Sequence, residues 1–295
     1  MNENPANENP GSKLADSKIC FYGAGSMAEA IVRGLVDTGA APAGNITVFN
    51  RANAERLAEL RANYGVLTAT NDAERRDALA SADVIVLAMK PKDAAAALKA
   101  LAPALRAEQL LVSLIAGLSI DTIRRLTRAD QPVIRTMPNT SSSIGLGATG
   151  IAFSGGLPED AQRLALDMFG AVGIAQVVAE PLLDAVTAVS GSGPAYLYYV
   201  MEAMIAAGIE QGLTPDTARE LTVQTVRGAA DMVRLTGEAP AELRRKVTSP
   251  NGTTQAAIET MQRLGVDSAI TTAMSNCAAR AGELGRAIAD EALRD

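Results

Sequence analysis

Histidine and tryptophan are both absent from the 295 residues. Many dehydrogenases use histidine to move the proton that accompanies a hydride, because only imidazole titrates near neutral pH without a special environment. The chain nevertheless has, near its start, what resembles a dinucleotide-binding strand and turn, Ile19–Gly25. A nicotinamide enzyme without histidine needs another proton donor or a substrate that already carries its proton, and the second option indicates an imine.

Concentrated positive charge and long apolar runs are also lacking. The net charge is −6 and the only basic triplet is Arg244–Lys246, so we expect no nucleic-acid partner. The most apolar stretch, Gly193–Ala207, contains Glu202 and is short for a membrane span, so we expect no membrane partner. The two cysteines, Cys20 and Cys277, lie far apart in sequence and favour a reducing compartment, which predicts a cytoplasmic location. We assign no metal ligands.

The first part of the chain alternates between strand-like and helix-like segments. Residues 1–17 lack the basic and apolar regions of a signal peptide, and we interpret them as a disordered tail. The alternation that follows, with helical patterns such as Met27–Thr38 and Ala54–Asn63, predicts an α/β Rossmann-type N-terminal domain over residues 18–179. Several apolar runs are continuous, as in parallel strands covered on both faces. The expected strands are Ile19–Tyr22, Ile46–Phe49, Val84–Ala88, Leu110–Ile115, Val133–Thr136, Gly150–Phe153 and Ile174–Val178.

After Glu180 the pattern becomes helical throughout. Pro181 suits a first helical position, and helix breaks are expected near Gly212–Pro215, Gly237–Pro240, Ser249–Gly252 and Gly265–Asp267. The sequence therefore predicts an all-α C-terminal domain over residues 180–295. Its helices carry more apolar surface than one copy could bury, which favours dimerisation.

A glycine-rich motif follows the first expected strand. Gly23–Ala28 matches the G-x-G-x-x-G/A pattern, in which glycines let the backbone approach a pyrophosphate at a helix N-terminus. A glycine-rich turn that serves only strand-to-helix packing is the alternative. An NAD site usually has a carboxylate after the second strand, whereas this chain has Asn50 and Arg51, and a guanidinium suits a 2′-phosphate. We therefore expect NADPH, with NADH serving less well. Arg51 could instead be a solvated side chain at the surface. The same alternative holds for Lys90, which follows the third expected strand and could line the nicotinamide half.

Two stretches of the helical half are not explained by packing alone. Gly191–Tyr196 places two glycines and a proline in a helical pattern, which either kinks a helix for close packing or marks a site. Ser249–Thr254 precedes the helical run Gln255–Leu264, and no acidic residue occurs from Ser249 to Ile258. The N-terminus of that helix could bind a small carboxylate, or the stretch could be an ordinary capped turn.

Taken together, these motifs resemble the pyrroline-5-carboxylate reductase family, over about Lys18 to Gly285. The order and spacing of the motifs carry the resemblance: FYGAGSMAEAI (Phe21–Ile31), AMKP (Ala88–Pro91), SLIAG (Ser113–Gly117), RTMPNT (Arg135–Thr140), DAVTAVSGSGPAY (Asp184–Tyr196) and VTSPNGTT (Val247–Thr254). The resemblance implies reduction of L-1-pyrroline-5-carboxylate to L-proline by NADPH, the last step of proline biosynthesis. It also implies a Rossmann domain, an interleaved helical dimer and a homo-oligomer that can reach a decamer.

The resemblance also implies roles for particular residues. Asn50 and Arg51 would contact the 2′-phosphate, and the full set of cofactor-binding residues would be Tyr22, Gly23, Ala24, Gly25, Ser26, Met27, Asn50, Arg51, Asn71, Ala88, Met89, Lys90, Pro91, Ile115, Ala116 and Gly117. The substrate-binding residues would be Glu180, Ser249, Gly252, Thr253 and Thr254, with Thr254 near the ring nitrogen as the catalytic residue. One departure is Asn251, where many relatives have glycine; asparagine tolerates a left-handed backbone, so we expect the loop geometry to survive.

The chemistry of such a substrate agrees with the absence of histidine. Pyrroline-5-carboxylate is a cyclic imine that reaches the site partly as an iminium, a strong hydride acceptor that needs no histidine acid. The enzyme would mainly orient the ring, and any remaining proton would come from water or through the hydroxyl of Thr254.

Three other functions are compatible with parts of the sequence. A β-hydroxyacid dehydrogenase would need a lysine in the central helix, but the stretch after Gly193 reads PAYLYYVMEA. A related imine reductase would differ only in the loop that selects the ring. A non-catalytic NADPH-binding sensor or scaffold dimer would have no need of the uninterrupted Ser249–Thr254 loop.

Overall fold

The computed structural model describes residues 13–127, 130–292 and 294, and it divides the chain into two compact units. Unit 1 contains the chain up to Gly191 together with the residues from Cys277 onward, and unit 2 is Ser192–Asn276. These limits differ from the boundary expected at residue 180, because the segment 180–191 packs against the sheet and the chain returns to unit 1 through its last helix.

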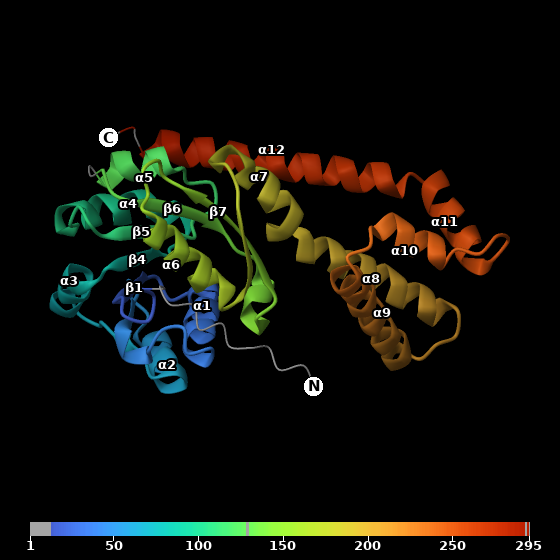
Figure 1. Cartoon of the computed structure of the whole chain (residues 1–295), viewed down its shortest axis with the longest axis horizontal. Helices are drawn as coiled ribbons and strands as arrows, with labels where there is room; N and C mark the ends of the chain where they lie inside the picture. The colour runs from blue at the N-terminus through green and yellow to red at the C-terminus, as the bar shows by residue number, and fades with distance from the viewer. Residues whose placement is uncertain (1–12, 128–129, 293, 295) are drawn as a thin grey trace. The chain divides into compact units, whose positions relative to one another are not determined.

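Unit 1 is built on an eight-stranded sheet with helices on both faces (Figure 1). The strand order is β3-β2-β1-β4-β5-β6-β7-β8, which contains the 3-2-1-4-5-6 order of a Rossmann fold. The strands are β1 Ile19–Tyr22, β2 Ile46–Phe49, β3 Leu67–Thr68, β4 Val84–Leu87, β5 Leu110–Ser113, β6 Val133–Met137, β7 Gly147–Phe153 and β8 Gly173–Val177. The helices are α1 Ser26–Asp37, α2 Ala54–Tyr64, α3 Asp72–Ser81, α4 Pro91–Leu101, α5 Ile120–Thr127, α6 Glu159–Gly170 and α7 Leu183–Val186.

All seven expected strands form, and two further features of the sheet were not expected from the sequence. The two-residue β3 pairs with β2 at its edge. Strands β6 and β7 are antiparallel, whereas every other pair is parallel. Residues 138–146 between them hold only a 3₁₀ helix, Thr140–Ile144, and a parallel crossover needs a dozen or more residues.

The apolar runs form two core layers because alternate side chains of a strand point to opposite faces of the sheet. One layer joins Phe21 and Val48 to α1, α2 and α6, and the other joins Ile85 and Leu111 to α4 and α5. Cys20 belongs to the second layer, and burial raises the pKa of its thiol to about 12.

The N-terminal segment corrects the expectation of a disordered tail over residues 1–17. Residues 1–12 lie outside the described residues. Leu14, however, is fully buried in the first core layer, and Lys13 Nζ lies 2.6 Å from Asp160 Oδ2. The apolar side chain of Leu14 thus anchors residues 13–17 to the sheet domain.

Unit 2 consists of helices whose breaks fall where the sequence predicts them. Its helices are α8 Gly193–Glu210, α9 Pro215–Thr236, α10 Pro240–Lys246, α11 Thr253–Arg263 and the first part of α12 Val266–Ala292. A π-helical turn, Thr187–Gly191, precedes α8, so the Gly191–Tyr196 stretch does interrupt the helical pattern. None of the described helices has the length and apolar character needed to cross a membrane.

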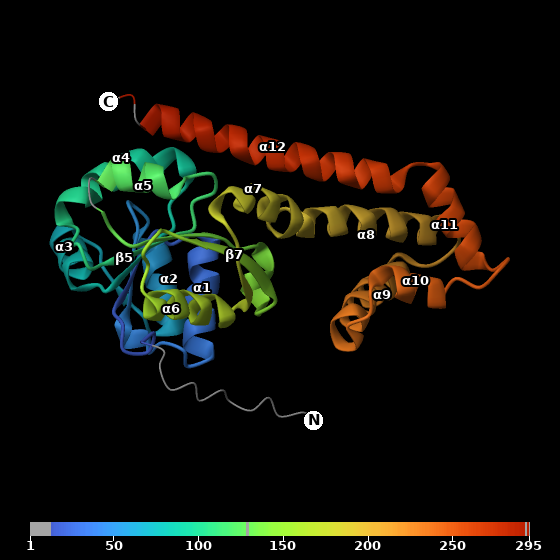
Figure 2. The ribbon, with the colours of Figure 1, turned by 45° about the horizontal axis from the view of Figure 1, so that its top comes forward.

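Helix α12 belongs to both units, and Figures 1 and 2 show it as one long helix. Its part from Cys277 onward is counted with unit 1, where Ile288 packs against the second core layer. The helix therefore brings residues from the end of the chain to the sheet domain.

Candidate functional site

The carboxyl ends of four neighbouring parallel strands place most of the predicted cofactor residues along one edge of the sheet. Tyr22 is the last residue of β1 and Gly23–Met27 follow it, Asn50 and Arg51 follow β2, Ala88–Pro91 follow β4, and Ile115–Gly117 follow β5. Because β2, β1, β4 and β5 are adjacent and parallel, these segments lie side by side. Ligands of open α/β sheets bind at such an edge, where the strand order reverses.

The glycine-rich turn has the geometry that a dinucleotide requires. Gly23 has φ 124°, and a Cβ built there would lie 2.4 Å from the carbonyl oxygen of Ala88, so only glycine fits. Gly25 precedes α1, and a Cβ built on it would meet no atom within 4 Å. Within the described part of the chain, no side chain is hydrogen-bonded to the N–H groups of Gly25, Ser26 and Met27. Open space and free N–H groups at a helix N-terminus fit the diphosphate of a dinucleotide.

Arg56 of α2 holds this turn in place, although nothing in the sequence marked it. Its Nε donates to the carbonyl oxygen of Ala24 at 3.2 Å, and its Nη2 pairs with Glu29 of α1. Tyr64 donates its hydroxyl to the same carboxylate at 3.0 Å. The hydrogen bond from Arg56 is the main reason that the pKa of Glu29 lies below its ordinary value. The sequence of α2 carries no signal for these contacts, because the Ala24 carbonyl and the Glu29 carboxylate lie outside this helix.

After β2, Asn50 and Arg51 differ in how free their side chains are. Asn50 Nδ2 donates to the carbonyl oxygen of Asn53 at 2.8 Å, and Asn50 Oδ1 accepts from Asn53 N at 2.9 Å. These bonds fix the turn that begins α2. The side chain of Arg51 is 90% exposed and lies 3.8 Å from Asp93 Oδ1, a loose surface pair. Arg51 is thus the side chain that can turn towards a ligand.

Of the remaining predicted cofactor residues, some are exposed and others hold the local backbone in place. Asn71 Oδ1 accepts from Ala73 N and Glu74 N at 3.0 Å each and caps α3. Lys90 is exposed immediately before α4, and its side chain makes no capping bond. Ala116 is exposed, whereas Ile115 before it is buried, so the β5 loop offers a backbone edge.

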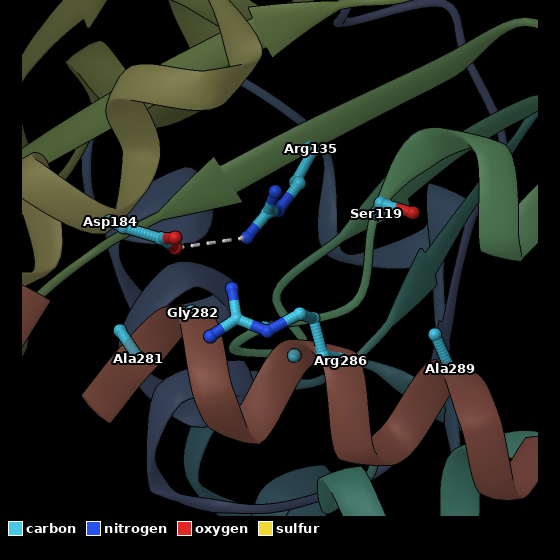
Figure 3. Close-up of a pocket in the computed structure, with 9 residues that line it drawn as sticks. Ser119, Arg135, Asp184, Ala281, Gly282, Arg286 and Ala289 are labelled. Carbon is cyan, nitrogen blue, oxygen red and sulfur yellow. Dashed lines mark ion pairs between the residues drawn. The ribbon is translucent and has the colours of Figure 1, made fainter. Parts of the chain in front are cut away.

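Gly117, the last predicted residue of the β5 loop, touches the C-terminal part of α12. A Cβ built on Gly285 would lie 2.5 Å from the carbonyl oxygen of Gly117, and Gly117 itself has φ 79°. Beside this contact is a pocket of about 230 Å³ (Figure 3), which is lined by Gly117, Ser119, Arg135, Asp184, Ala281, Gly282, Gly285, Arg286 and Ala289. The side chains of Arg135, Asp184 and Arg286 point into the same space.

Glu180 lies in an ion cluster beside this pocket. Its Oε1 accepts from Ile120 N at 2.8 Å and from Arg135 Nη1 at 3.3 Å, and Arg135 Nη2 lies 3.8 Å from Asp184 Oδ1. Arg135 is only 11% exposed, so its charge is balanced by two carboxylates in a partly buried setting. The structure thus gives Glu180 a structural role, joining α5 to β6; the expectation that it lies near the substrate stays a prediction.

The predicted carboxylate loop lies in unit 2, between α10 and α11. Asn251 has φ 59°, the left-handed conformation that asparagine tolerates better than most residues. Gly252 precedes α11, and Gln255 Oε1 accepts from Asn251 N at 2.7 Å. The N–H groups of Thr253 and Thr254 make no hydrogen bond to any described residue, and the first turn of α11 has no acidic side chain. The loop therefore presents free donors to an anion, with the Thr254 hydroxyl beside them.

Comparison with known proteins covers both halves of the chain. Residues 180–284 match the family model described as pyrroline-5-carboxylate reductase dimerisation, and residues 18–117 match the model described as NADP oxidoreductase coenzyme F420-dependent. Pyrroline-5-carboxylate reductase 1 of Bacillus spizizenii is 43% identical over 90% of this chain and 89% of its own length. The Pseudomonas aeruginosa pyrroline-5-carboxylate reductase is 41% identical over 92% and 98% of the two chains.

Solved structures agree with these matches. A pyrroline-5-carboxylate reductase from Coxiella burnetii superposes with a TM-score of 0.85 at 36% identity, covering 91% of this chain and 98% of that one. The Plasmodium falciparum pyrroline carboxylate reductase with NADP bound has the same fold, with a TM-score of 0.82 at 24% identity over 92% and 99% of the chains. The identities and coverage, together with the motif order, establish that this chain belongs to the pyrroline-5-carboxylate reductase family.

Proposed function

We propose that this chain reduces L-1-pyrroline-5-carboxylate to L-proline with NADPH as the hydride donor. The observation that carries the proposal is the α11 N-terminus, where Thr253 and Thr254 present free N–H groups in a turn shaped by left-handed Asn251. Such a turn suits a small carboxylate. The glycine-rich turn after β1 suits a dinucleotide, and the relatives at 41–43% identity are pyrroline-5-carboxylate reductases.

NADPH would be held along the sheet edge by the residues that the sequence predicts. The diphosphate would lie at Gly23–Met27, the 2′-phosphate at Arg51, and the nicotinamide half at the β4 and β5 loops. When bound, the nicotinamide supplies a hydride. The chain supplies the backbone cradle, and Arg56 keeps that cradle fixed through the carbonyl of Ala24. NADH, which has no 2′-phosphate, would serve less well.

The substrate would be held by its carboxylate at Ser249, Gly252 and Thr253. A Cβ built on Gly252 would lie 3.1 Å from the carbonyl oxygen of Ser249, so a larger residue would be closely packed against this turn. With the acid group fixed, the ring can be oriented for attack, and orientation alone lowers a barrier substantially.

Proton supply requires no strong acid in this chemistry. The substrate nitrogen arrives partly protonated as an iminium, so hydride addition to carbon gives the amine without a histidine. Thr254, whose hydroxyl belongs to the first turn of α11, would hold the ring nitrogen or relay a proton from water. A hydroxyl orients and donates a hydrogen bond at neutral pH but does not ionise.

We also infer that the protein works as a homo-oligomer. Helix α8 has no buried residue although it is rich in apolar side chains, and only Ala218 and Thr222 are buried within the described helices α8 to α11. Large apolar side chains are instead exposed in unit 2, among them Leu197, Tyr198, Tyr199, Met204, Leu221, Met232 and Leu235. A second copy of this chain would bury such an apolar surface, since residues 180–284 match a dimerisation model. A dimer, or an assembly up to a decamer, in the cytoplasm is the proposed working state.

The decisive experiment follows NADPH absorbance after addition of pyrroline-5-carboxylate, with proline measured as the product. Consumption of NADPH with equal formation of proline supports the proposal. No consumption at any substrate concentration would favour a non-catalytic NADPH-binding sensor, and faster turnover of a different cyclic imine would favour a related imine reductase. Thr254→Ala should lower turnover or substrate affinity, and Thr254→Ser, which keeps the hydroxyl, should retain most of both.

A further inference from the structure

We propose that Arg75 is a second cation for the 2′-phosphate of NADPH and that, together with Arg51, it sets the preference for NADPH over NADH. The inference rests on NADPH being the cofactor. It adds to the cofactor residues a side chain from α3, which no sequence motif includes.

The position of Arg75 is the first argument. It lies in the first turn of α3, directly after the short edge strand β3, which pairs with β2. Its Nη2 lies 3.3 Å from the carbonyl oxygen of Thr70 and 3.5 Å from that of Arg51. The residue after β2 is the place where Rossmann domains recognise the adenosine ribose. The Arg75 guanidinium, which comes from the helix after β3, therefore lies beside the residue that follows β2.

The hydrogen bonding of Arg75 is the second argument. Its only carboxylate partner within the described residues is Asp72, with 3.1 Å between Nη1 and Oδ1, and Asp72 is itself highly exposed. Such a pair contributes little and competes weakly with a ligand. The Nε of Arg75 is buried and has no hydrogen-bond partner among the residues described. The hydrogen bonds of the Arg75 side chain are thus incomplete, so turning towards a phosphate does not break a full set. A guanidinium binds a phosphate through paired N–H donors.

The local charge is the third argument. Burial raises the pKa of Tyr22, and the nearby charges of Arg75 and Arg51 oppose that rise, so both cations lie close to the end of β1. Two acidic side chains of this region already have partners. Asp93 pairs loosely with Arg51, and Glu74 accepts from the backbone and hydroxyl of Thr70. Two cations with no carboxylate after β2 attract a phosphate and leave the ribose hydroxyls of NADH without their usual acceptor.

A purely structural role for Arg75 makes a different prediction. If its bonds to the carbonyls of Thr70 and Arg51 only close the β2–β3 edge, then removing it should weaken the binding of every adenine nucleotide equally. A role in phosphate recognition should affect only nucleotides that carry a 2′-phosphate. The two roles can therefore be separated by one pair of ligands.

The test measures binding of 2′,5′-ADP and 5′-AMP, which differ only in the 2′-phosphate, to the full-length protein by calorimetry. Arg75→Gln should weaken 2′,5′-ADP binding about tenfold, the loss typical of one hydrogen bond to a charged group, and should change 5′-AMP binding less than about twofold. Arg76→Gln, which removes the exposed neighbouring arginine of the same helix, should change neither affinity. Arg75→Lys keeps the charge and should retain part of the 2′,5′-ADP affinity. In kinetics, kcat/KM for NADPH should fall about tenfold in Arg75→Gln while that for NADH stays constant.

Two results would overturn the proposal in distinguishable ways. Equal losses for both nucleotides in Arg75→Gln, or no loss for either, would overturn the role of Arg75 while wild-type discrimination stands. A wild-type protein that binds 2′,5′-ADP no more tightly than 5′-AMP would overturn the NADPH preference itself, and the role of Arg75 with it. Unfolding temperatures of the variants, measured alongside, show that each is folded before its affinity is compared.

Discussion

The contact between Gly117 and Gly285 gives the most direct test of how α12 supports the cofactor edge. In Gly285→Ala the new Cβ would lie 2.5 Å from the Gly117 carbonyl oxygen, so helix and loop must separate by about 0.9 Å to reach the ordinary contact distance of 3.4 Å. Forcing extra atoms into a packed contact costs about 1–3 kcal/mol. Replacing a helical glycine with alanine returns about 1 kcal/mol, so we expect a net loss of about 1 kcal/mol.

The assay combines thermal unfolding with NADPH binding. A loss of about 1 kcal/mol lowers the unfolding temperature by about 2–4 °C for a chain of this size class. Because Gly117 ends the β5 loop, displacement of its carbonyl should also weaken NADPH binding, by about fivefold if a similar free energy is lost there. Gly282→Ala is the matched control on the same helix, since its Cβ would meet only the side-chain ends of Asp184 and Arg286, which can move aside. An unchanged NADPH affinity and a raised unfolding temperature in Gly285→Ala would refute the reasoning.

Three further predictions concern other residues. Asn251→Ala should lose about 1–2 kcal/mol of loop stability because alanine resists φ 59°, while Asn251→Gly should keep substrate binding; equal KM values for both variants in the reductase assay would contradict this. The folded-state pKa of Glu29 lies below its ordinary value of 4.5. Its bond to Arg56 therefore stabilises the fold above that pH, and this contribution is lost as pH falls through the folded pKa. In urea unfolding, Glu29→Gln should have a lower free energy of unfolding than the wild type near neutral pH, and the difference should shrink in acid. In a Cys277→Ser background, Cys20 should resist alkylation at mildly alkaline pH until denaturant is added, because burial raises its pKa to about 12; rapid labelling of the folded protein would be the contrary result.

Much of the sheet domain could be predicted because buried parallel strands leave a clear sequence pattern. Val84–Leu87 and Leu110–Val112 are continuous apolar runs, and each lies in a fully buried strand. β3 could not be found in this way, because Leu67 and Thr68 are only two residues at the edge of the sheet and neither is buried. The antiparallel β7 had a signal in the short connection at 138–146, which is too short for a crossover helix.

The candidate site was predictable only where a residue's role depends on its own segment. The turn at Gly23 was recognisable because local backbone geometry restricts which residues fit, and Asn251 was noticed as a departure from the family motif. Arg56 and Arg75 were not recognisable, because each acts on a segment from another part of the chain, the Ala24 carbonyl and the end of β2. In sequence both are ordinary helical arginines, and only the tertiary structure shows what they reach.

The path of α12 bears on how the protein must be synthesised. The sheet domain is interrupted, because the stretch that covers Gly117 is translated only after the whole of Ser192–Asn276. A nascent chain can form the strands early, but the β5 loop cannot make its contact with Gly285 until that residue has been synthesised. A fragment that stops at residue 191 would therefore contain every strand and still lack its own cover, and splicing residues 277–292 onto it through a flexible linker would be needed to complete it.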